Sequence, residues 1–218
     1  MSRHRLIEQL GLRGLIHIWG EAGSGKTMLA SKIAADESRC SKVEWINTDS
    51  KQSFVGRLKL DINDQGGNLD NVIVSIVNDR SAIRELILNM GNVVEPGVSL
   101  VVIDPITRVL DMSRKDPNLW GREMVEVALP SLVGLVKKKN VNVIITSEAR
   151  TLDEQTTVAV HHKTISKWAD YELHIIKSRD GGTSQIIRED EDTVQMGLLG
   201  LQENSLVLTS SHSSVLEV

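Results

Sequence analysis

Cysteines and aromatic residues are scarce in this chain. Cys40 is the only cysteine among 218 residues, which excludes an intrachain disulfide and a metal site built from several thiolates. We expect Cys40 to fill a buried position. Aromatic residues make up 3% of the chain, so few side chains could stack on unpaired bases. Any contact with nucleic acid would therefore depend mainly on the phosphate backbone.

Long apolar runs and an excess of positive charge are also missing. No segment approaches the roughly 20 apolar residues of a membrane span, and residues 1–19 lack the apolar core and cleavage site of a secretion signal. We therefore expect a cytoplasmic protein with no membrane partner. The formal net charge of −4 argues against coating of nucleic acid through overall charge, but it allows a local basic patch.

The composition is that of an ordinary globular domain, with 40% hydrophobic and 25% charged residues. A chain of this length can bury one large core, and no repeat or linker divides it. We expect a single domain over 1–218. Within it, we expect a lead-in over 1–11, a mobile loop over 148–168 and a frayed tail over 209–218.

The segment GEAGSGKT, residues 20–27, fits the pattern G-x-x-x-x-G-K-[S/T] of a phosphate-binding loop, or P-loop. Glycines let successive backbone N–H groups turn toward phosphates, and the helix that follows directs its positive end at the same anion. We expect Lys26 to bind the β- and γ-phosphates of ATP and Thr27 to coordinate Mg²⁺. The expected nucleotide-binding residues are Gly20, Glu21, Ala22, Gly23, Ser24, Gly25, Lys26, Thr27 and Met28.

Short apolar runs alternate with helical patterns along most of the chain. The strand-like runs lie at 15–19, 43–49, 71–77, 99–105 and 141–147. This alternation predicts an α/β fold with a mainly parallel central sheet flanked by helices. Pro130 predicts a kink or break in the long helical stretch that contains it. Beyond Tyr171, strand-like runs joined by the turn RDGG predict a C-terminal antiparallel hairpin extension.

Acidic residues follow three of these runs, at the expected edge of the sheet. Asp104 ends LVVID and is expected to help hold Mg²⁺ rather than only cap a turn. Asp49 ends VEWINTD and is expected either to activate water or to cap the next helix or turn. After the run at 141–147, Ser147 or Glu148 could sense the γ-phosphate or simply cap the strand.

The segments GEAGSGKT, VEWINTD, LVVIDP, VIITSEAR and IIKSRDGGTSQIIRE occur in the order found in RecA/RadA-superfamily ATPase cores. Over residues 12–208 the chain resembles this superfamily, and it is most similar to the short archaeal RadA paralogues. The KaiC-like ATPases are near relatives. The resemblance implies a RecA-like P-loop fold with ATP and Mg²⁺ as cofactors.

The resemblance also suggests roles for four side chains. Asp49 stands where recombinases have a glutamate thought to activate water, and its side chain is one methylene shorter, which implies slow hydrolysis. Glu148 stands where recombinases have a phosphate-sensing glutamine. Lys177 and Arg179 resemble the K-x-R pair that oligomeric members insert across a subunit interface, although they could be two solvated charges before a turn.

The resemblance leaves two principal functions open. The first is a weakly hydrolysing ATPase of recombination and repair that binds single-stranded DNA, modulates a RadA-type recombinase or other paralogues, and could form a homo-oligomer. The second is a KaiC-like regulatory ATPase that acts on protein partners without DNA. A third possibility is a module in which nucleotide only stabilises the fold. The loop over 148–168 lies where recombinases contact DNA, and its candidate phosphate contacts are Arg150, His161, His162, Lys163 and Lys167.

Overall fold

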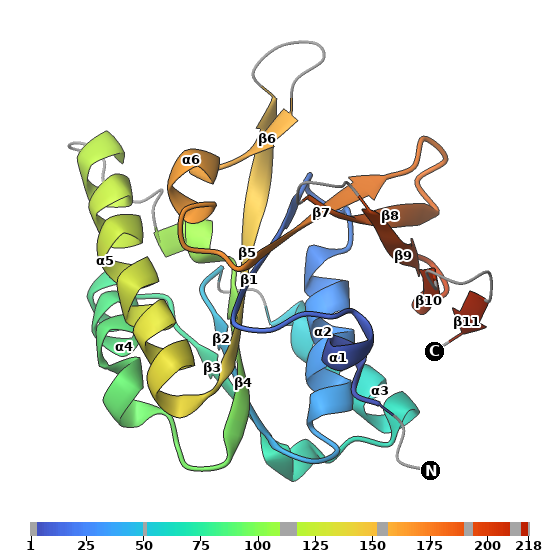
Figure 1. Cartoon of the computed structure of the whole chain (residues 1–218), viewed down its shortest axis with the longest axis horizontal. Helices are drawn as coiled ribbons and strands as arrows, with labels where there is room; N and C mark the ends of the chain where they lie inside the picture. Colours follow the sequence, from blue (N-terminus) through green and yellow to red (C-terminus); the bar gives the residue numbers. More distant parts are fainter. Residues whose placement is uncertain are drawn as a thin grey trace.

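The computed structural model describes residues 4–49, 52–109, 117–151, 157–189, 194–209 and 215–217. One large sheet runs through the molecule in the order β11-β10-β9-β8-β7-β1-β5-β4-β2-β3, and β6 pairs with the far end of β5 (Figure 1). The strands from β7 to β3 in this order are parallel to their neighbours, and those from β7 to β11 are antiparallel.

The parallel strands are β1 (Leu15–Gly20), β2 (Lys42–Asn47), β3 (Val72–Ile76), β4 (Val98–Asp104), β5 (Asn142–Thr151) and β7 (Tyr171–Lys177). The antiparallel strands are β6 (Thr157–Ala159), β8 (Thr183–Arg188), β9 (Val194–Gly200), β10 (Ser205–Thr209) and β11 (Val215–Glu217). The mixed α/β fold with a mainly parallel sheet and a C-terminal antiparallel extension is thereby confirmed.

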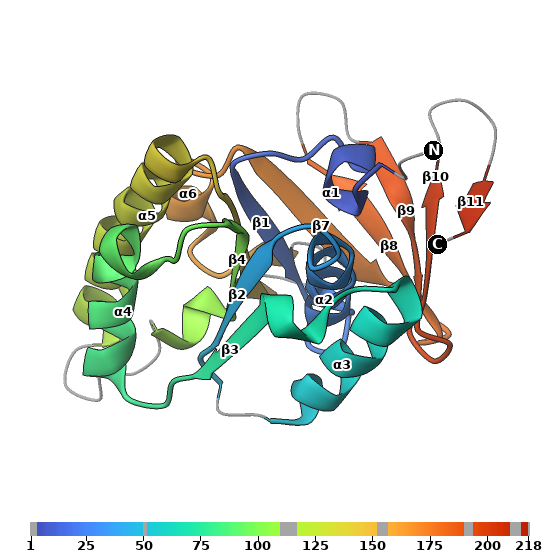
Figure 2. The same ribbon diagram turned by 90° about the horizontal axis from the view of Figure 1, so that it is seen from below.

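Helices cover both faces of the sheet. One face carries α1 (Leu6–Gln9), α2 (Lys26–Glu37) and α3 (Ser53–Gln65), and the other carries α4 (Arg80–Val93), α5 (Pro117–Lys139) and α6 (His162–Ile165) (Figures 1 and 2). Short 3₁₀ turns occupy Leu69–Asn71 and Ile106–Val109. Each face has its own apolar core, as expected when every parallel strand is covered on both sides.

Helix α2, which follows the P-loop, is buried continuously from Leu29 to Glu37. Its polar side chains therefore need partners inside the protein. Asp61 of α3 provides one of them, because it accepts a hydrogen bond of 2.5 Å from Ser31 and lies 3.5 Å from the Lys32 ammonium. These contacts fix α2 against α3.

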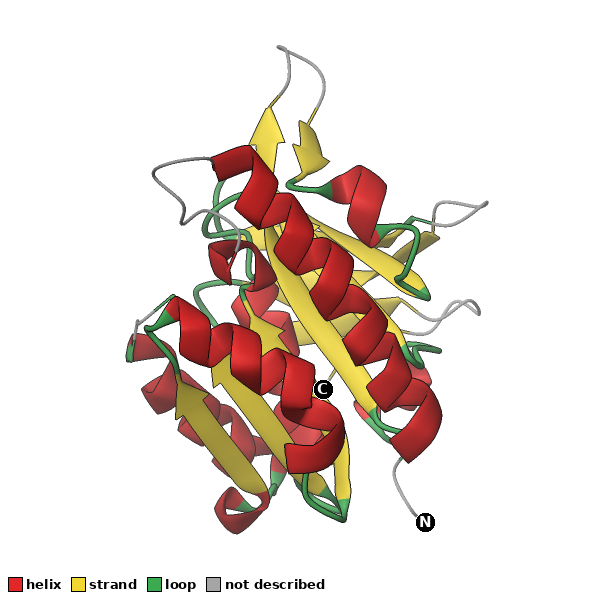
Figure 3. Cartoon of the chain, turned by 90° about the vertical axis from the view of Figure 1, so that its left-hand side faces the viewer, coloured by secondary structure: helices red, strands yellow, loops and turns green. Residues whose placement is uncertain are grey.

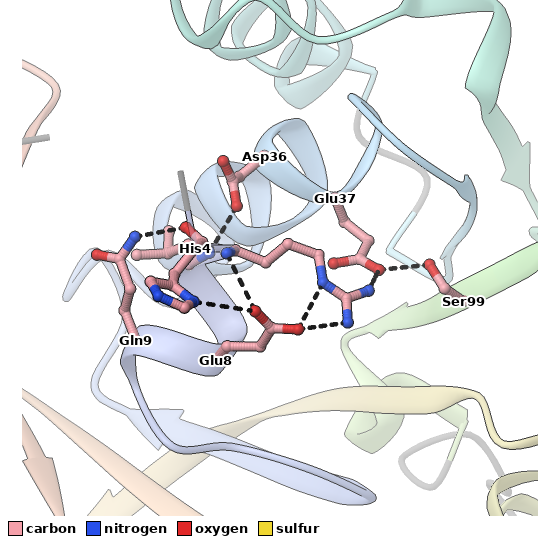
Figure 4. Close-up of polar contacts among 8 residues, drawn as sticks. His4, Glu8, Gln9, Asp36, Glu37 and Ser99 are labelled. Atoms are coloured by element: carbon pink, nitrogen blue, oxygen red, sulfur yellow. Dashed lines mark hydrogen bonds and ion pairs between the residues drawn. The ribbon is translucent and has the colours of Figure 1, made fainter. Parts of the chain in front are cut away.

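Polar contacts also hold the C-terminal end of α2 (Figure 4). Glu37 accepts hydrogen bonds from Arg5, at 2.8 Å, and from the Ser99 hydroxyl, at 2.6 Å. Asp36 accepts one from the backbone N–H of Leu6, at 2.5 Å. The segment before the first strand thus forms part of the packed domain, and α2 is anchored at the end opposite the P-loop.

Regular structure occupies much of the expected loop over 148–168. Strand β5 continues to Thr151 and pairs with β6, from Ala149 opposite Ala159 to Thr151 opposite Thr157, and α6 follows (Figure 3). Residues 152–156 lie outside the described residues. Sequence periodicity did not predict these strands, because the ribbon projects beyond the main sheet and its residues show little alternation of apolar and polar side chains.

The structure bears on three smaller expectations. The break expected at Pro130 is absent, because helix α5 continues through this residue, and the loss of one hydrogen bond is offset by an apolar side that packs on the domain and includes Leu129 and Leu132. A kink at Pro130 stays a prediction. Cys40 is exposed, since it lies in the turn after α2. Residues 215–217 of the expected frayed tail form β11, which pairs with β10, while 210–214 and 218 lie outside the described residues, so fraying stays a prediction.

Candidate nucleotide site

The P-loop joins β1 to α2 at the carboxyl edge of the parallel strands. Gly23 and Gly25 have φ values of 73° and 102°, a region that side chains with a Cβ rarely adopt. A Cβ at Gly20 would lie 2.4 Å from the backbone oxygen of Ile175 on β7, and a Cβ at Gly25 would lie 2.8 Å from the Leu201 side chain. The glycines therefore meet both conformational and steric requirements of the loop.

Lys26 and Thr27 begin α2 and point into the same region. The Lys26 ammonium donates to the backbone oxygens of Gly20, at 3.0 Å, and Glu21, at 2.7 Å. Burial lowers the pKa of Lys26, and the negative charges of Asp104 and Glu148 oppose that shift. The Thr27 hydroxyl donates to Asp104 at 2.9 Å. A cation and a hydroxyl–carboxylate pair thus meet at the start of α2.

Asp104 ends β4 and is 5% exposed. The hydroxyls of Thr27 and Thr146 each donate to one of its carboxylate oxygens. Burial nevertheless raises the pKa of Asp104, and the charge of nearby Asp49 adds to this rise. A buried carboxylate beside a threonine hydroxyl, with few other partners for its charge, is an arrangement that suits a divalent cation.

A cavity of about 450 Å³ opens beside the P-loop, within the usual size range of small-molecule sites. Among the described residues it is lined by Gly23, Gly25, Lys26, Thr27, Met28, Ser31, Asn47, Asp49, Ser53, Phe54, Arg57, Asp104 and Leu201. The glycine cradle, the lysine and the Thr27–Asp104 pair fit a nucleoside triphosphate with Mg²⁺. Among the described residues no group of three or more His, Cys, Asp or Glu side chains could hold a metal without such a ligand.

Several residues of this cavity were missed by the sequence analysis. Asn47 ends β2 at the same edge of the sheet as the P-loop, and its buried side-chain oxygen has no hydrogen-bond partner among the described residues. Its position at the end of a buried strand could have identified it. Phe54 and Arg57 come from α3 and Leu201 from the β9–β10 turn, so only the tertiary fold brings them to the P-loop.

Asp49 lies two residues beyond β2 and lines the cavity together with Lys26 and Asp104. Gln52, rather than Asp49, occupies the N-cap position of α3, so Asp49 does not cap that helix. The structure therefore brings Asp49 into the same cavity as the P-loop lysine, and its role as the base stays a prediction.

Glu148 lies beside the loop but outside the set of residues that line the cavity. It is opposite Gly20 in the β1–β5 pairing, and its charge acts on Lys26. Glu148 is inside β5, which ends at Thr151, so it does not cap the strand. A position next to the P-loop lysine remains compatible with sensing of a phosphate.

Lys177 ends β7 and Arg179 lies in the β7–β8 turn, and both are exposed. Strand β7 is parallel to β1, with Ile175 opposite Gly20, so both cations lie at the same edge of the sheet as the P-loop. Neither is among the described residues that line the cavity. Within one chain these two residues thus lie at the edge of the sheet that carries the site, without lining the cavity.

A buried polar network lies behind the P-loop. His17 of β1 is fully buried, with Nδ1 2.8 Å from a carboxylate oxygen of Glu172 and Nε2 2.7 Å from the Ser147 hydroxyl. The same oxygen of Glu172 lies 3.6 Å from Nδ1 of His162. Ser147 therefore belongs to this network, which joins β1, β5, β7 and α6.

This network predicts a stability loss in mild acid. Burial lowers the pKa of His17 below its usual 6.5, although Glu172 opposes the shift. The stabilisation from a neutral His17 is full above pH 6.5 and is lost as pH falls below it, because the unfolded chain then binds a proton that the folded chain does not. We expect urea unfolding between pH 8 and pH 5 to show this slope, at most about 1.4 kcal/mol per pH unit. His17→Gln should flatten it, whereas His4→Gln at an exposed position should not; equal slopes in all three proteins would contradict the assignment.

Three features together define a RecA-like P-loop fold. They are the P-loop between β1 and α2, the insertion of one strand, β5, between β1 and β4, and the antiparallel extension on β7. Comparison with solved structures supports this class: the crystal structure of the RadB recombinase matches with a TM-score of 0.73 and 21% sequence identity, over 98% of this chain and 96% of that chain. No protein-family model and no curated protein sequence matches the chain. In the described part, no helix is long and apolar enough to cross a membrane.

Proposed function

We propose that this chain is a cytoplasmic, ATP-binding and weakly hydrolysing accessory protein of homologous recombination and repair. The observation that carries the proposal is the meeting of Lys26, Asp49 and the Thr27–Asp104 pair in one cavity of a RecA-like fold. The similarity of the whole chain to the RadB recombinase structure favours recombination over other uses of this fold.

In this proposal the P-loop N–H groups and Lys26 bind the phosphates, and Thr27 and Asp104 hold the metal. Bound Mg²⁺ supplies neutralisation of the charge that develops in phosphoryl transfer. Asp49 orients and deprotonates the attacking water. General-base placement contributes about 10²–10⁴ in rate, so a carboxylate on a side chain one methylene shorter supports slow turnover.

Lys177 and Arg179 are proposed to act in a homo-oligomer. They lie at the P-loop edge but do not line their own chain's cavity, so their charge would act on a nucleotide bound to a neighbouring subunit. A cation supplied in this way stabilises the transition state and links turnover to assembly.

The partners in this proposal are single-stranded DNA and a RadA-type recombinase or another paralogue. Arg150 of β5 and Lys163 of α6 are exposed on the ribbon and the helix that lie beyond Ser147 and Glu148 in the chain. Phosphates on these cations would be coupled to the nucleotide through Glu148, which acts on Lys26.

The first test is ATP turnover with and without single-stranded DNA at low and moderate salt. We expect slow, Mg²⁺-dependent turnover that DNA stimulates, and Asp49→Ala should reduce both rates by about 10²-fold or more because the general base is lost. Asp64→Ala, at an exposed position on α3, is the matched control. Turnover of Asp49→Ala at the wild-type rate would exclude the base assignment.

A regulatory ATPase that acts on protein partners is the second candidate. Glu148 beside the P-loop favours it, because the resemblance associates glutamate at this position with the KaiC-like group. Intact turnover with no response to DNA would support this candidate over recombination. Nucleotide binding without any turnover would leave a module in which the nucleotide only stabilises the fold.

A further inference from the structure

A second cavity, of about 790 Å³, lies at the opposite edge of the sheet from the P-loop. It is bordered by residues that precede β1, β5 and β7, which are the amino ends of parallel strands. Its walls are the last turns of α5 and the connection from α6 to β7, which run beside each other (Figures 1 and 3). We call this cavity the α5 groove, and none of the described residues lines both it and the nucleotide cavity.

Cations outnumber carboxylates in the α5 groove. Among the described residues, Arg13, Lys137 and Lys167 line it, and Asp170 contributes the one carboxylate. That carboxylate accepts the backbone N–H of Leu15 at 2.8 Å, so part of its hydrogen-bonding capacity is already used. Lys137 and Lys167 are exposed and form no hydrogen bond or ion pair with the described residues. The groove is therefore a basic site on a chain whose net charge is −4.

An exposed aromatic ring lies among these cations. Trp168 is 38% exposed, whereas Trp19 and Trp45 are buried in the core. Its backbone N–H donates to the Ile165 oxygen at 2.9 Å, which holds the main chain of Trp168 at the end of α6. Tyr171, partly buried at the start of β7, lines the same groove. A partly exposed indole and two lysines without partners among the described residues therefore line the same groove.

We propose that the α5 groove binds single-stranded nucleic acid, with a base stacked on Trp168 and the flanking phosphates on Lys137 and Lys167. Cations that follow the backbone, combined with an aromatic ring for the bases, are the general means of binding single strands without sequence preference. An acidic peptide could bind the lysines, but it carries no nucleobase to stack on the indole. A duplex has bases, but they stay stacked on one another and are not available to Trp168. The choice of nucleic acid agrees with the proposed function, yet the groove is separate from the β5–β6 ribbon and from ATP.

The test measures binding of fluorescent (dT)20 to the full chain at several salt concentrations. Trp168→Ala should weaken binding about fivefold or more at unchanged salt slope, and Trp168→Phe should retain most of the affinity. Lys137→Ala and Lys167→Ala should each weaken binding and make the log–log salt slope shallower by about 0.7. Lys138→Ala is the matched control, because Lys138 is exposed on the same turn but does not line the groove.

Equal binding by the wild type and the Trp168 and lysine variants would overturn the proposal, as would an equal loss in Lys138→Ala. Competition by poly-glutamate as strong as that by unlabelled (dT)20 would also overturn it, because the groove would then recognise charge alone. ATP turnover on the same variants separates this proposal from the function proposed above. If the variants bind DNA normally and DNA still stimulates turnover, only the groove proposal is excluded. If the variants lose DNA binding but DNA stimulates turnover in no protein, wild type included, only the recombination role is excluded.

Discussion

Lys26→Ala is expected to raise the dissociation constant for ATP by about a hundredfold or more. The Lys26 ammonium is partly buried at the start of α2, where its attraction for a phosphate is screened less than on the surface. Removal of a buried partner of a charge costs about 2–5 kcal/mol, and a hundredfold change in affinity corresponds to about 2.7 kcal/mol. Equilibrium titration with ATP and Mg²⁺ measures this directly.

The same substitution should leave the nucleotide-free protein folded. Within the described part of the chain, Lys26 donates to the backbone oxygens of Gly20 and Glu21 alone, and Glu21 is exposed, so water can replace the ammonium there. Thermal unfolding with saturating ATP provides a second readout, because a ligand that binds only the folded state raises its stability. Wild type and the control Lys59→Ala, at an exposed position on α3, should be stabilised by ATP, and Lys26→Ala should not. Unchanged ATP affinity in Lys26→Ala would contradict the nucleotide site itself.

Local sequence patterns were sufficient to predict the wall of the cavity that the P-loop and Asp104 form. The P-loop is contiguous in sequence, and β4 is an apolar run that ends in Asp104, so both can be recognised without knowledge of the fold. The parallel arrangement then implies that their ligand ends lie at one edge. Asp49 could be placed by the same reasoning, because β2 ends at that edge as well.

The opposite wall of the cavity could not be predicted in this way. Arg57 projects from α3 and Leu201 from a turn near the C-terminal end of the chain, and their position depends on how α3 and the antiparallel strands pack around α2. The ribbon of β5 and β6 escaped prediction for a related reason, since its hydrogen bonds lie beyond the core and leave no apolar pattern. The α5 groove likewise combines residues separated by more than a hundred positions, from Arg13 to Trp168.

Asp104→Asn is expected to stabilise the nucleotide-free protein while it abolishes Mg²⁺-dependent turnover. Burial raises the pKa of Asp104 above its usual 3.8, so the carboxylate favours folding less once it is ionised. A folded-state pKa above the unfolded value means that stability is full at lower pH and is lost as pH rises through the folded-state pKa. At pH 7 the variant, which carries no such charge, should exceed the wild type by about 0.5–2 kcal/mol. Thr27 and Thr146 can still hydrogen-bond an amide, so the fold is retained.

Urea unfolding without Mg²⁺, between pH 4 and pH 8, measures this effect. The advantage of Asp104→Asn should grow as pH rises through the folded-state pKa of Asp104 and then stay constant, whereas Asp64→Asn at an exposed position should show no such trend. Lower stability of Asp104→Asn at every pH would contradict this prediction. It would mean that the hydrogen bonds from the two threonine hydroxyls stabilise the carboxylate by more than the burial of its charge costs. The expected result instead implies that the fold gives up stability at this position to keep a carboxylate ready for a cation, as functional sites commonly do.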